Sequence, residues 1–308
     1  MPAQPREKAN VAILVTGQTL FMIAAITVMT LSGVVGHQLS PDPGLATLPI
    51  ALMMVGTVIS TLPASLYMKR VGRRQGFITG AAVGGVGGGM LSFAAIAAGS
   101  FWLFCAGNLL LGLYQGFAMY YRFAAADVAS PAFRSRAISY VMAGGVVAAF
   151  LGPWNASITL GWVAGVPLGG PYLIIALLAL VAIVLLTQLR VPAGGEPQPG
   201  DVSRPMAAIA AQPAFLVAVL AGAVGYAIMV LVMTATPLAM RSAGFEMNQV
   251  AFIMQWHVLG MFAPSFVTGS LIARFGVDRI LLAGAALLAV AVLLANLGQA
   301  IGHFWMAL

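Results

Sequence analysis

Long apolar runs alternate with short polar segments along the whole chain. Nine runs reach the roughly 20 residues that a helix needs to cross a membrane: Val11–Gly36, Leu45–Met68, Gly76–Gly99, Phe101–Ala126, Ala137–Thr159, Tyr172–Leu189, Phe215–Ala239, Val250–Ile272 and Ile280–Gln299. Because lipid offers no hydrogen bonds to the backbone, each run predicts a helix. The pattern therefore predicts an all-α, polytopic membrane protein.

One polar stretch interrupts this rhythm. "RVPAGGEPQPGDVSRP", from Arg190 to Pro205, is the longest segment rich in proline and glycine, a composition typical of linkers. We expect an N-terminal bundle of six helices at 1–189, a cytoplasmic linker at 190–207, and a partial C-terminal bundle at 208–308.

Composition and charge agree with a lipid environment. The chain is 61% hydrophobic and 7% charged, whereas a soluble domain is about 25% charged. With the N-terminus inside, twelve of the fourteen basic residues fall in cytoplasmic segments, as the positive-inside rule requires: Arg6, Lys8, Lys69, Arg70, Arg73, Arg74, Arg134, Arg136, Arg190, Arg204, Arg274 and Arg279. The placement of these residues predicts a cell-membrane protein with a cytoplasmic N-terminus. It also accounts for the net charge of +7, so we expect no nucleic-acid partner.

A phrase of the first half recurs in the second. "SLYMKRVGRRQGFITGAA" at 65–82 is echoed by "GSLIARFGVDRILLAGAA" at 269–286, so that Arg70 and Gly72 return as Arg274 and Gly276, 204 residues later. Such a repeat predicts two parallel halves, one of the known transporter architectures. The closing "GHFWMAL" begins a counterpart of the helix at Phe101. We therefore expect a second bundle of three to four helices, truncated within the tenth helix.

The loop "SLYMKRVGRRQ" resembles the loop between helices two and three of the major facilitator superfamily, whose pattern is Gly-x-Leu-x-Asp-Arg-x-Gly-Arg-Arg/Lys. Arg70, Gly72, Arg73 and Arg74 fit that pattern, and Lys69 stands where Asp is usual. The resemblance implies a two-bundle secondary transporter that moves a small molecule by alternating access.

The resemblance also implies a gating role for this loop. It pairs Arg73 with an acid at the cytoplasmic end of helix four, here Asp127, in a contact that could latch the inner side shut. The alternative is that these charges only anchor the topology. The expected gating residues are Arg70, Gly72, Arg73, Arg74, Asp127, Arg274 and Gly276.

Helix four carries a polar stripe. Asn108, Gly112, Gln115, Met119 and Arg122 follow steps of 4, 3, 4 and 3, which places them on one helical face. Polar groups are expensive in lipid, so this face is expected to line a substrate path. Hydrogen bonding between packed helices is the alternative.

Other helices add further candidates for the path: Gln18, Trp154, Asn155, Tyr226, Gln255, Trp256 and His257. Histidine is the ordinary side chain that titrates near neutrality, so His257 is a candidate for proton coupling, with simple packing as the alternative. Gly152–Pro153 partly resembles the Gly-Pro motif of superfamily antiporters and slightly favours export; an uptake permease is the alternative.

The sequence offers little chemistry beyond transport. It shows no nucleophile–base pair, carboxylate pair or metal-ligand cluster, and only one cysteine, Cys105. We expect neither an enzyme nor a cofactor or metal protein. The 17 methionines show no Met-x-x-Met cluster, which favours packing over copper binding. The expected partners are a small-molecule substrate, the lipid bilayer and a coupling proton or ion; a membrane receptor or sensor is the alternative from another class.

Overall fold

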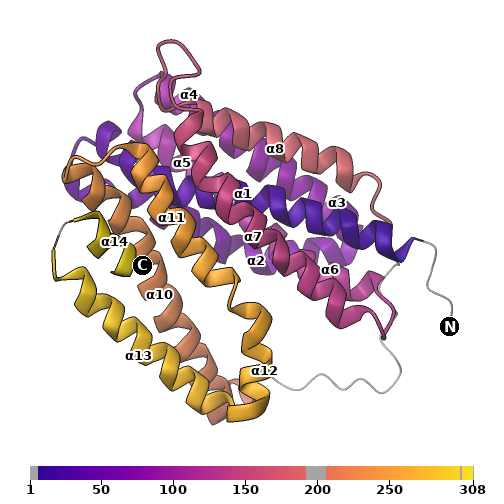
Figure 1. The fold of residues 1–308 in the computed structure, drawn as a ribbon. Coiled ribbons are helices and arrows are strands. Elements are labelled where there is room, and N and C mark those ends of the chain that lie inside the picture. Colours follow the sequence, from indigo (N-terminus) through magenta and orange to yellow (C-terminus); the bar gives the residue numbers. More distant parts are fainter. Residues whose placement is uncertain (1–5, 192–205, 299, 308) are drawn as a thin grey trace.

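The predicted membrane crossings form helices in the computed structural model, which describes residues 6–191, 206–298 and 300–307 (Figure 1). The first six crossings are α1 (Glu7–Leu39), η1 (Pro43–Leu45) with α2 (Leu48–Val71), α3 (Arg73–Thr79) with η2 (Gly80–Gly87) and α4 (Gly88–Ala97), α5 (Phe101–Ala118) with α6 (Tyr121–Val128), α7 (Arg134–Ile158) and α8 (Gly170–Leu186). After them come α9 (Met206–Ala210), α10 (Pro213–Ser242), α11 (Met247–Phe262), α12 (Ser265–Phe275), α13 (Val277–Ala295) and α14 (Ile301–Ala307).

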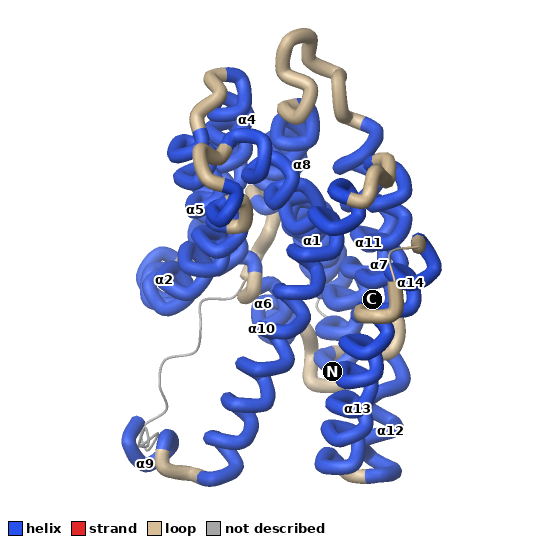
Figure 2. The backbone as a smooth tube through the Cα atoms, turned by 90° about the vertical axis from the view of Figure 1, so that its left-hand side faces the viewer, coloured by secondary structure: helices blue, strands red, loops and turns tan. Residues whose placement is uncertain are grey.

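Within the described residues, eight helical segments are long and apolar enough to span a membrane, and α8 is a shorter apolar helix. No strand occurs in the described ranges (Figure 2). The prediction of an all-α, polytopic membrane protein is therefore confirmed.

Three crossings are less regular than the apolar runs predicted. The third contains a π-helical segment, η2, in its glycine-rich middle. The fourth is interrupted at Met119 and Tyr120, between α5 and α6. The eighth breaks between α11 and α12 at Pro264, which has no N–H to continue the helical ladder. The break in the fourth crossing falls inside the predicted polar stripe, between Gln115 and Arg122.

Small residues set how closely the first helices pack. A Cβ on Gly112 of α5 would overlap the Met53 carbonyl of α2 and lie 3.0 Å from the Thr57 nitrogen. The Thr57 hydroxyl also donates to the Gly112 carbonyl at 3.2 Å. Small interfacial residues allow such backbone contact between membrane helices. Gly112 therefore lies in the packing contact between α5 and α2.

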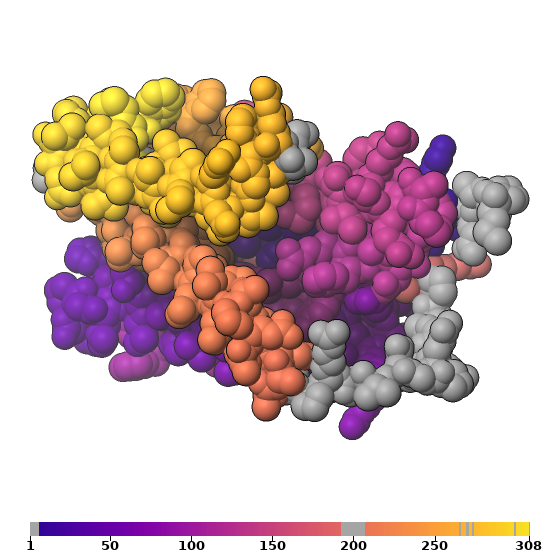
Figure 3. All heavy atoms as spheres, turned by 90° about the horizontal axis from the view of Figure 1, so that it is seen from below, coloured from indigo at the N-terminus to yellow at the C-terminus, as the bar shows by residue number. Residues whose placement is uncertain are grey.

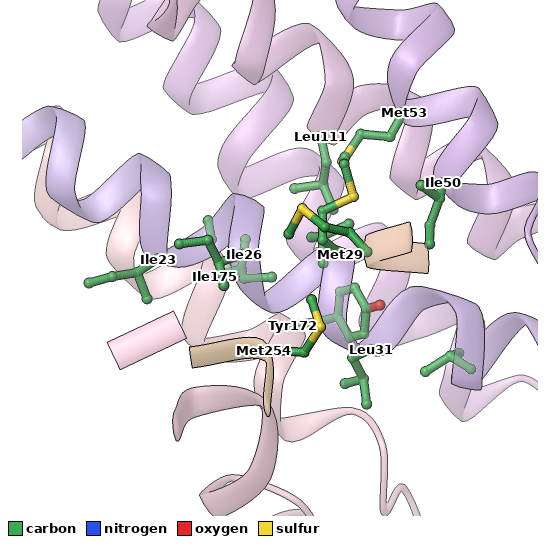
Figure 4. Packing of buried hydrophobic residues seen from close by; sticks show 14 of the residues in the cluster. Ile23, Ile26, Met29, Leu31, Ile50, Met53, Leu111, Tyr172, Ile175 and Met254 are labelled. Carbon is green, nitrogen blue, oxygen red and sulfur yellow. The ribbon is translucent and has the colours of Figure 1, made fainter. Parts of the chain in front are cut away.

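A single buried cluster joins the early helices to the later ones. It includes Met29, Ile50 and Tyr172 from the first six crossings, together with Met233 and Met254 from α10 and α11. Figure 4 shows side chains of this cluster, including Met29 and Met254, close together. The apolar contacts between α1, α7, α10 and α11 thus form one continuous interior.

The helices meet at one end and separate at the other. We call the end that carries Arg70, Arg134 and Arg274 the basic end. Towards the opposite end, a Cβ on Gly33 of α1 would lie 3.4 Å from Leu238 of α10. Towards the basic end, residues 211–224 are all exposed, and the lower part of α10 stands apart from α12 and α13 in Figure 2. Figure 3 shows a hollow on this side, between the orange atoms of α10 and the magenta atoms of the earlier helices.

The repeated phrase has the same backbone geometry in both copies. Gly72 has φ 87° and ψ 155°, and Gly276 has φ 84° and ψ 159°. Each ends one helix and begins the next at a positive φ that glycine adopts without strain. The division into bundles at 1–189 and 208–308 stays a prediction, and most of the expected linker lies outside the described residues.

Candidate substrate cavity

A central cavity lies where the two groups of helices face each other. Its volume is about 230 Å³, and its walls come from α1, α5, α6, α7, α10, α11 and the α5–α6 break. The lining residues are Gln18, Phe21, Met22, Ala25, Ile26, Met29, Gln115, Met119, Arg122, Met142, Tyr226, Met229, Met233, Val258, Met261 and Phe262. Both halves of the chain therefore contribute to one site.

A lateral cavity of about 980 Å³ adjoins it between α2, α5 and α10. Gln115, Met119 and Tyr226 line both cavities. Ligand pockets usually measure about 300–1,000 Å³. The two cavities together offer enough room for a small organic molecule.

Polar groups gather where the cavities meet. The Tyr226 hydroxyl from α10 donates to the Met54 sulfur of α2 at 3.8 Å, and the Gln115 side chain of α5 lines the same two cavities. The Arg122 guanidinium lies 5.0 Å from the centre of the Phe123 ring. Tyr226 thus connects the later helices to the wall of the earlier ones.

Arg122 dominates the electrostatics of the central cavity. No carboxylate is among the described residues that line either cavity, and Arg122 is the one Lys or Arg residue among them. A guanidinium always carries its charge and presents five N–H donors in a planar fork. The central cavity is therefore suited to a ligand that offers acceptor atoms.

The predicted polar stripe divides into two parts. Gln115, Met119 and Arg122 line the central cavity. Asn108 instead is buried, accepts from the Ser32 hydroxyl of α1 at 3.0 Å and donates to the Phe104 carbonyl at 2.9 Å. The alternative of hydrogen bonding between helices thus describes the geometry of Asn108.

The candidates on α7 also lie apart from these cavities. Asn155 is buried and donates to the Thr27 hydroxyl of α1 at 3.1 Å and to the Pro171 carbonyl at the start of α8 at 3.4 Å. Its neighbour Trp154 is 56% exposed. Neither residue is among those lining the central or lateral cavity. By contrast, Gln18 and Tyr226 do line the central one.

The three candidates on α11 lie beside the central cavity rather than in its wall. Gln255 and His257 are half-buried. Trp256 stacks edge-on against Phe252 and against Trp305 of α14. The cavity wall from α11 is formed instead by Val258 and its neighbours further along the helix. A path role for these three residues stays a prediction.

Methionine is the feature that sequence reasoning missed. It supplies 17 of the 308 residues, but seven of the sixteen that line the central cavity. A partial signal was present, because Met229 and Met233 are four residues apart on one helix face. The gathering across helices could not be read from the chain, since it depends on how those helices pack.

The expected ion pair at the basic end is present. An Arg73 nitrogen lies 2.5 Å from an Asp127 oxygen, joining the start of α3 to the end of α6. Nearby, the buried Glu7 carboxylate accepts from the Ser130 N–H at 2.6 Å and from its hydroxyl at 2.8 Å. Both contacts lie within the first six crossings. The Arg73–Asp127 pair therefore does not itself hold the later helices, and it is formed while the basic end is parted.

The other expected gating residues lie at the two repeated turns, between α2 and α3 and between α12 and α13. Arg70 and Arg74 are exposed, as are Arg274 and the two loop glycines. Their gating role stays a prediction. Among the described residues, no group of three or more His, Cys, Asp or Glu side chains could hold a metal ion.

Membrane-crossing helices arranged around a cavity that both halves line define a membrane carrier. The chain belongs to the Major Facilitator Superfamily, whose family description matches residues 13–308. It is 42% identical over 303 residues to the riboflavin transporter RfnT of Brucella anthropi, covering 98% of this chain and 76% of that protein. It is also 28% identical over 268 residues to an uncharacterized MFS-type transporter, YdeG, of Bacillus subtilis, covering 80% of this chain and 61% of that protein.

Solved structures agree on the fold. The fucose:proton symporter FucP of Escherichia coli matches with a TM-score of 0.64 at 20% identity, covering 96% of this chain and 79% of that one. A bacterial homologue of the lysosomal transporter Spinster, in an inward-facing and occupied conformation, matches with a TM-score of 0.62 at 19% identity, covering 99% and 71%. The family match and the 42% identity to RfnT confirm the superfamily identified from the loop residues, and the protein is a transporter rather than an enzyme.

Proposed function

We propose that this protein carries riboflavin or a closely related flat heteroaromatic compound across the cell membrane by alternating access. The observation that carries the proposal is the cavity between the two groups of helices, where polar side chains interrupt an apolar wall. The 42% identity to a riboflavin transporter supports this substrate class. A ring system with a polar edge and a hydroxylated chain matches such a mixed lining.

The basic end is proposed to face the cytoplasm. Positively charged loops are retained on the cytoplasmic side of membranes, and Lys69, Arg70 and Arg74 are exposed at this end. With that orientation, the parted helices open the central cavity towards the cell interior. The exposed arginines of the two repeated loops would then face the cytoplasm, where they are placed to act in gating.

The direction of transport is open to experiment. The Gly-Pro stretch slightly favoured export, but the comparisons do not support that direction. In the structure, the Gly152 carbonyl accepts from the Thr27 hydroxyl at 3.0 Å, so this stretch joins α7 to α1. Proton coupling through His257 is likewise part of the proposal, because the imidazole is the one side chain with an ordinary pKa near neutrality, about 6.5.

Transport assays on the purified protein in proteoliposomes test the proposal directly. Riboflavin is expected to cross the membrane, measured by its own fluorescence on either side. Gln115→Ala is expected to weaken transport, because Gln115 lines both cavities. Trp154→Phe, which changes an exposed residue outside both cavities, is the matched control. Intact, folded protein that moves no riboflavin in either direction, with or without a pH gradient, would refute the proposal.

A further inference from the structure

The seven methionines of the central cavity come from five parts of the chain. α1 supplies Met22 and Met29, α7 supplies Met142, α10 supplies Met229 and Met233, and α11 supplies Met261; Met119 lies at the break between α5 and α6. We call these seven residues the methionine wall. Helices that are distant in sequence thus bring the same side chain to one surface.

We propose that the methionine wall is the ring-binding surface of this transporter and holds the flat face of a heteroaromatic substrate through thioether–ring contacts. This inference rests on the proposed function and goes further, because it assigns the part of the substrate that is recognised and the residues that recognise it.

Chemistry favours this use of methionine over simple space filling. A thioether is polarizable and makes favourable contacts with aromatic rings, with the sulfur about 5 Å from the ring. Its unbranched side chain also adapts to different shapes, which suits a site that must bind and release its ligand. Leucine or isoleucine would fill the same space in a static core with better-defined rotamers.

The wall is also accessible in the way a binding surface requires. Met29 and Met233 are buried, at 7% and 4% exposure, and they anchor the wall in the core cluster. Met119 and Met261 are 41% and 38% exposed. Met22, Met142 and Met229 are half-buried. A ligand in the central cavity would therefore reach sulfur atoms that are already positioned by packing.

Polar groups in the same cavity are placed to bind the edge of the ring. Gln18, Gln115 and Arg122 come from α1, α5 and α6, and all three line the central cavity. The amides offer both donors and acceptors, and the guanidinium offers donors only. A ring lying on the methionine wall could present carbonyl and nitrogen acceptors to these side chains.

Binding of ring and chain analogues tests which part of the substrate the wall recognises. The probes are riboflavin, lumiflavin, which keeps the ring but has a methyl in place of the ribityl chain, and ribitol, which is the chain alone. Lumiflavin is expected to displace riboflavin from the purified protein, and ribitol is not. If ribitol competes and lumiflavin does not, the chain rather than the ring is recognised, and the inference is wrong.

Substitution of sulfur by carbon tests the residues. Met229→Leu and Met233→Leu keep the apolar volume nearly unchanged, and each is expected to weaken riboflavin and lumiflavin binding by about two- to tenfold. Met90→Leu is the matched control, because Met90 is 47% exposed on α4 and lies outside both cavities. Equal binding by all three variants, with thermal stability preserved, would overturn the role of the thioethers.

Oxidative footprinting avoids the question of whether a variant folds. Mild peroxide converts accessible methionines to sulfoxides, which mass spectrometry locates. Riboflavin is expected to protect Met119, Met229 and Met261 but not Met90, and ribitol is expected to protect none of them.

The outcomes separate the inference from the proposed function. If riboflavin is transported but leaves oxidation of the wall unchanged, the transport proposal stands and the methionine wall is only packing. If riboflavin is neither bound nor transported, the proposed function is wrong, and the inference that rests on it is wrong as well. If Ag⁺ binds tightly and protects the methionine wall from oxidation, while no flavin protects it, the wall binds a soft metal ion and the inference is wrong.

Discussion

Replacing Asn155 by alanine separates its two possible roles, path lining and helix packing. Asn155 is 5% exposed. Its amide donates to the Thr27 hydroxyl at 3.1 Å and to the Pro171 carbonyl at 3.4 Å, so it joins α7 to α1 and to α8. Asn155→Ala removes both of these bonds between helices, together with the bond that the Asn155 amide oxygen accepts from the Thr159 hydroxyl at 3.3 Å, and leaves the Pro171 carbonyl without this donor. The structure therefore predicts a loss of stability with little change in substrate affinity.

The size of that loss follows from the two bonds. Hydrogen bonds between membrane helices contribute about 0.6 kcal/mol on average and up to about 1.7 kcal/mol. The bond to Pro171 is long and belongs at the weak end of that range. Together with the lost side-chain contacts, we expect about 1–2 kcal/mol, which is roughly a tenfold change in the unfolding equilibrium.

Reversible unfolding in detergent micelles measures this difference, and riboflavin titration of the same samples measures affinity. Trp154→Phe is the control and is expected to change stability by less than about 0.5 kcal/mol, because its side chain is exposed. In the double variant with Thr27→Val, the losses are expected to be less than additive, since the two residues share a bond. If Asn155→Ala leaves stability unchanged but weakens riboflavin binding tenfold, the packing account is refuted and Asn155 belongs to the path.

Three further predictions concern packing, charge and pH. Gly112→Ala is expected to cost about 3 kcal/mol or more, because the added Cβ meets the backbone of α2; Gly87→Ala, whose nearest neighbour would lie 3.7 Å away, should accumulate normally in membranes. Exchanging the charges of Arg73 and Asp127 together is expected to restore the transport rate lost in either single reversal, at a stability change of about 0.2–1 kcal/mol; simple additivity would argue against the pair. His257→Gln is expected to flatten the pH dependence of transport, because histidine is the side chain that ordinarily titrates near neutrality; an unchanged profile would assign His257 to packing.

The number and kind of helices could be predicted from local sequence. Each apolar run had to form a helix because lipid leaves the backbone no other partner. The repeat seen in the sequence also has a counterpart in the backbone, since Gly72 and Gly276 occupy the same position in the repeated phrase and share a positive φ. The Arg73–Asp127 contact followed from family resemblance at this loop and is present at 2.5 Å.

Which neighbours each polar side chain meets could be learned only from the tertiary structure. Asn108 and Gln115 are seven residues apart on one helix and were expected to share a face. Asn108 nevertheless packs against Ser32 of α1, while Gln115 lines both cavities, because different neighbours lie opposite the two positions. Gln115, Met119 and Arg122 line the central cavity together, although the helix is interrupted at Met119 and Tyr120. Periodicity gives a direction around one helix but not what lies opposite it.

The methionine wall shows the same limit most clearly. Methionine is an ordinary packing residue of apolar helices, so no local pattern distinguishes Met22 or Met261 from the others. Only the packing of α1, α7, α10 and α11 brings their sulfur atoms to one cavity. The sequence by itself determined a membrane-spanning helical chain and its family, because those depend on hydrophobicity and short motifs. The tertiary structure decided which side chains a substrate can meet, because that depends on contacts between helices far apart in the chain.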